Sequence, residues 1–365
     1  MAPAPSMKFP PENLVNRSLE LILANQSPTG AFIASPNFPT YAFCWFRDGS
    51  YIAYALDLYH QHDASARFHA WAADVISQRV ELIQRALQKA AAGQLLSDAD
   101  ILHTRYTLTG QENTATSWEN FQLDGFGTWL WALAEHQRLS QQPLSPAMLA
   151  SARLVADYLV GLWDHPCYDC WEEFGDQIHP HTLAAIYGGL VAYGQLTTDH
   201  RHATTTAIRA FLYQKGLAAG RWQKFLGNHQ VDASLLAIST PYRLLSPSDP
   251  IMISTVQKIE ADLCAGGVKR YLADTYYGGG RWILLAAWLG WYWCEVGQPE
   301  KAHQLRQWIE AQADERGWLP EQVPLGLNND SMFAPWVQRW GPVATPLLWS
   351  HAEYLILTKM LPEPR

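Results

Sequence analysis

Charge is scarce in this 365-residue chain, and no stretch of it is strongly basic. Charged residues make up 16% of the sequence, and the formal net charge is −8. A surface that follows nucleic-acid phosphates needs clustered lysine and arginine, so this composition predicts no nucleic-acid partner. Hydrophobic residues make up 48% of the chain, which is enough to fill a large core and is untypical of a disordered protein.

Cysteine is also rare, and its five residues form an odd set. Sparse cysteines in a long chain are typical of reduced thiols in a reducing compartment. Cys167 and Cys170 form a lone C-x-x-C pair, which we interpret as ordinary thiols because no second pair or redox context accompanies it. The first residues lack a basic stretch followed by an apolar core, so we expect no signal peptide and predict a cytoplasmic protein.

Long apolar runs and ligand signatures are missing as well. No run reaches the ~18–20 apolar residues of a membrane span, so no membrane partner is expected. The thirteen histidines are scattered, and the closest pair, His179 and His181, has no evident third ligand. The glycines at 278–280 fit a tight turn better than a phosphate cradle. We therefore expect neither a metal nor a cofactor.

Aromatic residues, by contrast, are abundant, with 17 Trp, 16 Tyr and 12 Phe. An indole offers a flat apolar face and one N–H donor, which suits cores, interfaces and ligand platforms. Sugars present C–H-rich faces that fit such platforms. Most of these tryptophans are expected in the core, but several fall in predicted loops, where core packing explains them less well.

Apolar residues recur at helical spacing through most of the chain, which predicts an all-α protein. No Pro-, Ser- or Gly-rich linker divides the sequence, so residues 1–365 are expected to form a single domain. Strand patterns are scarce, and only the stretch 92–117 is compatible with a small hairpin. About twelve helices are predicted, at 11–25, 48–61, 65–91, 124–139, 146–163, 179–195, 199–215, 229–238, 250–265, 280–296, 299–312 and 342–360.

Distinctive polar and aromatic residues gather before every second predicted helix. The twelve helices thus form six pairs, and each pair has one such loop, which predicts a closed ring of six helix pairs. A ring of this kind brings all six loops to one end, around one pocket. The alternative is that loops simply collect polar residues, but the regular placement favours the ring.

Two acidic segments in aromatic settings are candidates for catalysis. Glu172 and Glu173 directly follow Trp171, and Glu321 lies in an aromatic loop far downstream. General acid and base hydrolysis needs one protonated and one ionised carboxyl, and the environment can push two pKa values apart. Any single glutamate is more often an ordinary solvated residue, so the assignment depends on the residues that accompany these.

Six motifs accompany them, in a fixed order along the chain. They are Tyr41–Asp48, Trp118 with Gln122, Asp124 and Gly125, Trp171–Glu173, Arg270-Tyr271 with Asp274–Gly280 and Trp282, Glu321-Gln322, and Leu348–His351. Each motif alone is weak, but all six at compatible spacing resemble glycoside hydrolase family 15, the glucoamylases and related exo-acting glucosidases. The resemblance implies an (α/α)6 toroid with its active site in the loops at one end, in agreement with the predicted ring.

The resemblance also implies which residues carry the chemistry. Glu172 would be the general acid and Glu321 the general base of an inverting hydrolysis, with a water molecule between the two carboxyls. Arg47 and Asp48 resemble the family's clamp on the non-reducing glucose. A guanidinium beside a carboxylate suits vicinal hydroxyls, which both donate and accept hydrogen bonds.

The remaining site predictions concern hydroxyl contacts and aromatic walls. Arg270 and Glu173 look like further hydroxyl contacts, and Tyr41 is expected near the positive charge that develops on the sugar ring. Asp124 is expected to be a helix-start carboxylate rather than a catalyst. The predicted platforms are Trp118, Trp282 and Trp349, for which core packing is the alternative, and Trp171 is expected to orient the acid loop.

The expected reaction is the release of β-glucose from the non-reducing end of short α-glucosides. A missing signal peptide and the lack of room for a starch-binding domain favour small oligosaccharides, with isomaltose or other α-1,6-linked sugars as first candidates. The alternatives are a maltose- or starch-type glucoamylase, a trehalase, and a phosphorolytic enzyme, which would not need Glu321. An enzyme of another class, a non-hydrolytic sugar-binding or epimerising toroid, is a further alternative.

Overall fold

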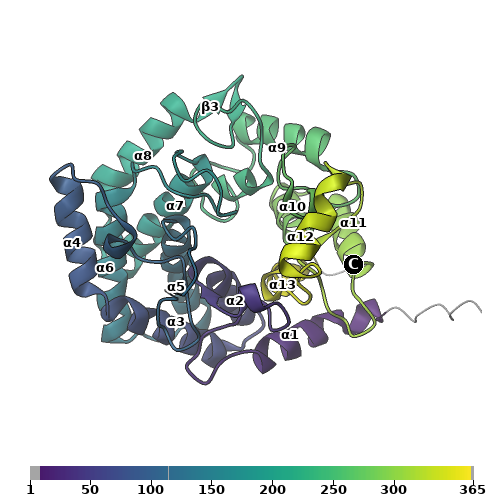
Figure 1. The fold of residues 1–365 in the computed structure, drawn as a ribbon, viewed down its shortest axis with the longest axis horizontal. Helices are drawn as coiled ribbons and strands as arrows, with labels where there is room; N and C mark the ends of the chain where they lie inside the picture. The colour runs from purple at the N-terminus through teal and green to yellow at the C-terminus, as the bar shows by residue number, and fades with distance from the viewer. Residues whose placement is uncertain (1–8, 114, 363–365) are drawn as a thin grey trace, which may run out of the picture.

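Six helical segments pack side by side into a closed ring in the computed structural model, which describes residues 9–113 and 115–362. Each segment contacts the next, and the last returns to the first (Figure 1). In order around the ring they are α2 (Phe46–Leu58), α5 (Asp124–Ser140), α7 (Pro180–Thr197), the 3-10 helix η4 (Ala233–Ile238), α10 (Ile283–Glu295) and α13 (Leu348–Met360).

A second layer of helices surrounds this inner ring. Most outer helices contact the inner helix next to them in the chain, while α1 packs on α13 and α4 packs on α6. The outer helices are α1 (Leu14–Ala24), α3 (His62–Ser77), α4 (Val80–Ala91), α6 (Pro146–Leu162), α8 (His202–Lys215), α9 (Pro250–Leu263) and α11 (Pro299–Glu310). The two layers confirm the all-α prediction and the (α/α)6 toroid.

Burial follows the two layers. In α10, every residue from Ile283 to Trp293 is buried, whereas in α11 only Ala302 and Ile309 are. A helix that is apolar all round belongs inside a protein, and one with a single apolar stripe belongs on its surface. The sequence therefore decides which helix of each pair faces the middle of the ring.

Three predicted helices differ from the observed ones. The segment 65–91 is broken at Arg79, whose side chain donates to the Val75 carbonyl at the end of α3 and to Gly110 across the loop. The segment 229–238 forms only the short η4. The last predicted helix starts later, at Leu348, because Gly341, with φ of 91°, and two prolines interrupt the chain before it.

Several short elements were not predicted. Helix α12 (Phe333–Trp340) lies outside both layers, and none of its residues is buried. The remaining 3-10 helices are η1 (Pro11–Asn13), η2 (Pro39–Tyr41), η3 (Asp98–Asp100), η5 (Tyr276–Gly278) and η6 (Asp330–Met332).

Three two-stranded antiparallel ladders join the loops. They are β1 (Cys44–Trp45) with β2 (Arg105–Tyr106), β3 (Leu217–Ala218) with β4 (Arg221–Trp222), and β5 (Arg281–Trp282) with β6 (Gln322–Val323). The hairpin predicted within 92–117 is wrong, because β2 pairs with the distant β1, placing Trp45 opposite Arg105. Among the described residues, no helix combines the length and the apolar composition needed to cross a membrane.

The inner helices begin at the same end of the ring. Arg47 and Asp48 lie in the first turn of α2, Asp124 opens α5, and Trp282 directly precedes α10. Their polar and aromatic residues therefore meet at one end, as the recurrence of such loops before every second helix predicted.

Two glycines allow α5 and α7 to cross closely. A Cβ atom at Gly127 would lie 2.4 Å from the carbonyl oxygen of Ala185, and one at Gly189 would lie 2.4 Å from the carbonyl oxygen of Gly127. Real Cβ atoms do not approach backbone oxygens so closely. The spacing between two neighbouring inner helices therefore depends on these residues.

We expect Gly127→Ala to lower the free energy of unfolding by about 1–3 kcal/mol, because the helices must move apart. Urea denaturation measures the change. Gly161→Ala is the matched control, since its Cβ meets only the side chain of the half-buried Leu87, whose end can rotate. Equal stability of the two variants would contradict this account of the crossing.

Candidate active site

One cavity of about 260 Å³ lies at this end of the ring. It is lined by all eleven residues that the sequence analysis assigned to catalysis or substrate binding. They are Tyr41, Arg47, Asp48, Trp118, Trp171, Glu172, Glu173, Arg270, Trp282, Glu321 and Trp349. Residues from both ends of the chain thus line the same cavity. Their individual contacts indicate what each of them does there.

Glu172 is held by two donors through one of its oxygens. Trp45 Nε1 donates to Glu172 Oε1 at 2.7 Å, and Gln122 Nε2 donates to the same oxygen at 3.1 Å. Oε2 takes part in neither bond. The backbone φ of Glu172 is 67°, in the left-handed region that a residue with a side chain rarely adopts. Neighbouring groups must therefore hold this conformation in place.

Asp169 provides that support. Its Oδ1 accepts from the backbone N–H groups of Trp171 and Glu173, at 2.9 and 3.0 Å. Its carbonyl accepts from the N–H of Glu172 at 2.9 Å, and its own N–H donates to the Glu173 carbonyl at 3.0 Å. These four bonds close the segment 169–173 into a tight turn with Glu172 inside it.

A buried lysine fixes this turn to the ring. Lys224 Nζ lies 2.8 Å from Asp169 Oδ2 and 2.7 Å from Asp232 Oδ2, and all three side chains are buried. Asp232 also accepts from Trp171 Nε1 at 3.0 Å. Burial, the largest single influence, raises the pKa of Asp169, but the Lys224 ammonium and the hydrogen bonds that Asp169 accepts together bring that pKa below its ordinary value.

Glu321 has a different environment. It is buried, its Oε1 accepts from the Tyr41 hydroxyl at 2.9 Å, and Oε2 has no hydrogen-bond partner within the described part of the chain. The Tyr41 and Tyr276 hydroxyls lie 2.8 Å apart. Burial raises the pKa of Glu321 to about 8, although the hydrogen bond from Tyr41 acts in the opposite direction.

The two glutamates are linked through their donors. Tyr41 and Trp45 lie edge to face with ring centroids 5.6 Å apart, and one donates to Glu321 while the other donates to Glu172. The backbone fixes Glu321 as well, since its N–H donates to the Ala344 carbonyl at 2.9 Å. One short segment of chain therefore holds both carboxylates.

Arg47 is buried among acceptors. Its Nη1 donates to Gln122 at 3.0 Å and lies 3.3 Å from Asp124 Oδ2, and its Nε lies 3.6 Å from Asp48. Asp124 opens α5, as the sequence predicted, but its carboxylate pairs with Arg47 and makes no capping bond. Asp124 therefore positions the guanidinium.

Arg270 and Glu173 form a second charged group. Arg270 is paired through two nitrogens with Asp274, and its Nη2 also donates to Glu173 at 3.1 Å. The Tyr271 hydroxyl donates to the other oxygen of Glu173. Burial outweighs Arg270 and raises the pKa of Glu173 above its ordinary value. These groups offer donors and acceptors on the same wall of the cavity.

The cavity has an aromatic rim that sequence analysis did not predict. Trp336, Arg339 and Trp340 of α12 line it, and Trp340 stacks on Trp118 with ring centroids 6.2 Å apart. Arg105 covers the Trp118 ring at 3.4 Å from its centroid. Two tryptophans four positions apart lie on one face of a helix, and this spacing is the signal that would have revealed the rim.

Metal-binding side chains do not gather in this cavity. In the described ranges, the group of His, Asp, Glu or Cys residues with suitable spacing is Asp57, His69 and His136, none of which lines it. The cavity therefore offers carboxyls, guanidinium groups and aromatic faces, which suit a neutral polyhydroxylated ligand and acid–base chemistry.

A ring of two helical layers, with two glutamates lining one aromatic cavity, is typical of a toroidal glycoside hydrolase. The model of "Glycosyl hydrolases family 15" matches residues 11–319, so the chain belongs to this family. The match includes Glu172 but ends before Glu321. The inverting mechanism follows from membership in the family.

Similar proteins agree with this assignment. The isomaltose glucohydrolase of Kribbella flavida is 39% identical over 357 residues, which cover 95% of this chain and 92% of the relative. The solved structure of a wild-type glycosidase has a TM-score of 0.92 at 39% identity, with 96% of each chain covered. A bacterial glucoamylase complexed with acarbose, at 19% identity and a TM-score of 0.75, covers 95% of this chain and 55% of its own, and supports the fold alone.

We expect Lys224→Met to lower the free energy of unfolding by about 3–5 kcal/mol, because it leaves two buried aspartates without their cation. Lys301→Met is the control, since Lys301 pairs with Glu260 at the surface, where an ion pair contributes at most about 1 kcal/mol. Urea denaturation compares the two. An equal, small effect would show that Lys224 does not hold the acid turn.

Proposed function

We propose that this chain is an inverting, exo-acting α-glucoside hydrolase that releases β-glucose from the non-reducing end of short α-glucosides. The observation that carries the proposal is that Glu172 and Glu321, from distant segments, line one cavity and have different hydrogen-bond partners. Isomaltose and related α-1,6-linked oligosaccharides are the proposed substrates, because the Kribbella flavida relative is an isomaltose glucohydrolase.

In the proposed mechanism, Glu172 is the general acid. Trp45 and Gln122 both donate to Oε1, which leaves Oε2 to carry the proton. That proton passes to the glycosidic oxygen as the bond from this oxygen to the anomeric carbon breaks. The Asp169 turn keeps the carboxyl fixed during the transfer.

Glu321 is the proposed general base. Tyr41 binds Oε1, and Oε2 is available to accept a proton from a water molecule that attacks the opposite face of the anomeric carbon. Inversion requires about 6.5–9.5 Å between the two carboxyls to leave room for that water. Phosphorolysis would need no such base, so Glu321 favours hydrolysis.

The remaining lining residues are proposed to bind the terminal glucose. Arg47 with Asp48 offers donors and acceptors for vicinal hydroxyls, and Arg270 with Glu173 offers another such pair. The predicted aromatic walls are Trp118, Trp282 and Trp349, and Trp171 also lines the cavity, where it is proposed to orient the acid loop. A solved structure of the 39%-identical glycosidase holds glucose, which supports a monosaccharide-sized subsite.

We further propose that the enzyme acts in the cytoplasm. Its five cysteines are free thiols in the structure, and burial raises the pKa of Cys44 and Cys167, so both remain protonated. Such thiols suit a reducing compartment.

Replacing either glutamate tests the assignment of roles. Glu172→Gln and Glu321→Gln should each lower kcat by about 10²–10⁴-fold while leaving the circular dichroism spectrum unchanged, because general acid and base catalysis contributes this much. Glu300→Gln, at an exposed site on α11, is the control. If Glu172→Gln or Glu321→Gln kept the wild-type kcat, the role assigned to that glutamate would be rejected.

The pH profile of kcat/KM tests Glu321 as the base. Tyr41→Phe removes the hydrogen bond that stabilises the Glu321 carboxylate, so the pKa of Glu321, already raised to about 8, should move further up. Because the base must be ionised, the acidic limb of the profile should shift to higher pH. Tyr277→Phe, whose hydroxyl donates to Gly341, should leave the limb in place. An unshifted limb in Tyr41→Phe would contradict the assignment.

A comparison of substrates tests the proposed specificity. We expect kcat/KM to be highest for isomaltose and lower for maltose, trehalose and soluble starch, as the similarity to the Kribbella flavida isomaltose glucohydrolase suggests. Initial rates of glucose release measure all four. A preference for starch or trehalose would replace the isomaltose proposal with one of the alternatives.

A further inference from the structure

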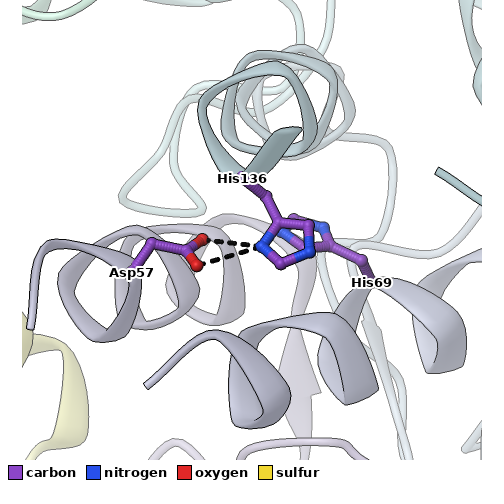
Figure 2. Close-up of side chains that lie close together, drawn as sticks. All are labelled: Asp57, His69 and His136. Atoms are coloured by element: carbon purple, nitrogen blue, oxygen red, sulfur yellow. Dashed lines mark hydrogen bonds and ion pairs between the residues drawn. The ribbon is translucent and has the colours of Figure 1, made fainter. Parts of the chain in front are cut away.

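A second cluster of reactive side chains lies away from the cavity. Asp57 of α2, His69 of α3 and His136 of α5 are all buried, and one ligand atom of each lies within 4.8 Å of the others. Figure 2 shows Asp57 and His136 facing one another, with His69 behind the His136 ring. The ring centroids of the two histidines are 5.0 Å apart.

This cluster is well separated from the catalytic end. Asp57 comes ten residues after Arg47 in α2, and His136 comes twelve residues after Asp124 in α5. At 1.5 Å per residue, these positions are about 15 Å and about 18 Å further along their helices. The cluster therefore joins two inner helices to the outer α3 at the opposite end of the ring.

Hydrogen bonds within the protein explain only part of the cluster. Asp57 is well supplied with donors, since His136 Nδ1 lies 3.0 Å from both of its oxygens and Ser65 donates to Oδ2 at 2.6 Å. His69 is fully buried, yet neither of its ring nitrogens has a partner among the residues that the structure describes. An imidazole always carries at least one N–H, and burying a polar group without a partner costs about 1–3 kcal/mol.

We propose that Asp57, His69 and His136 bind one divalent transition-metal ion of the zinc type. One carboxylate oxygen and two imidazole nitrogens suit zinc, cobalt or nickel, whereas calcium and magnesium prefer oxygen ligands alone. A bound ion gives His69 the partner that the protein does not. Metal–ligand bonds of about 2.0–2.1 Å place two ligands of one ion at most about 4.2 Å apart, and the ligand atoms of this group all lie within 4.8 Å of one another.

The proton balance of binding is simple. Coordination through His136 Nδ1 would replace its hydrogen bond to Asp57. The neutral tautomer with its proton on Nε2 leaves that nitrogen free, so no net proton needs to be released. His62, whose side chain is 27% exposed, lies beside this group, with its Nδ1 2.8 Å from Asp57 Oδ1.

The ion would stabilise the ring without taking part in catalysis. It would link α2, α3 and α5, because its three coordinating residues lie on three separate helices. An ion that binds only the folded chain raises the free energy of unfolding. Sequence analysis predicted no metal because the three residues share no short spacing. Sites of this kind form only when the helices pack.

The test measures metal in protein purified without a histidine tag. We expect about one equivalent of a transition metal per chain in the wild type by mass spectrometry of the digested protein, and a loss of it in His69→Gln. His202→Gln is the control, since His200 and His202 form an exposed stacked pair elsewhere. Equal metal content in His69→Gln and wild type would overturn the proposal.

A second measurement uses the wild type alone and does not depend on a variant that folds. Wild type stripped by a chelator should gain about 3 °C in Tm when free Zn²⁺ reaches a hundredfold excess over its Kd, and kcat should stay the same. A stripped protein whose Tm does not respond to Zn²⁺ would contradict the site. A fall in kcat on stripping would contradict its structural role, without bearing on Glu172 or Glu321.

Discussion

The segment from Tyr41 to Asp48 is the constraint on which the active site depends. Tyr41 donates to Glu321, Trp45 donates to Glu172, and Arg47 reaches Gln122 and Asp124. The same segment pairs through β1 with β2 and continues directly into the inner helix α2. Its position therefore sets where both carboxylates lie relative to one another and to the sugar-binding groups.

Around this segment, buried charges are arranged in advance of substrate binding. Lys224 is shared by Asp169 and Asp232, and Arg270 is shared by Asp274 and Glu173. Buried charges that are fixed in place interact more strongly than they do in solvent and need little reorganisation during the reaction. The same burial raises the pKa of Glu321, so the Tyr41 hydroxyl is needed to favour its ionised form.

Apolar periodicity predicted most of the ring, and the resemblance to the family singled out the eleven residues that line the cavity. Apolar periodicity marked the long helices, and motifs such as Trp171–Glu173 stand in loops where packing does not explain them. Sequence analysis missed α12, which buries no residue in the core and shows itself only in the spacing of Trp336 and Trp340, and the break at Arg79, whose side chain bonds to Gly110 across a loop. The pairing of β1 with β2 and the Asp57 cluster likewise arise only when distant segments meet.

The central claim is that Glu172 and Glu321 act on opposite faces of one glycosidic bond. Proton NMR of the first glucose released from isomaltose by the wild-type enzyme tests it most directly, before the anomers interconvert. The account predicts that the β-anomer appears first, because water attacks the face opposite the departing oxygen. Initial release of the α-anomer would show retention and would contradict the assignment of Glu321 as the base.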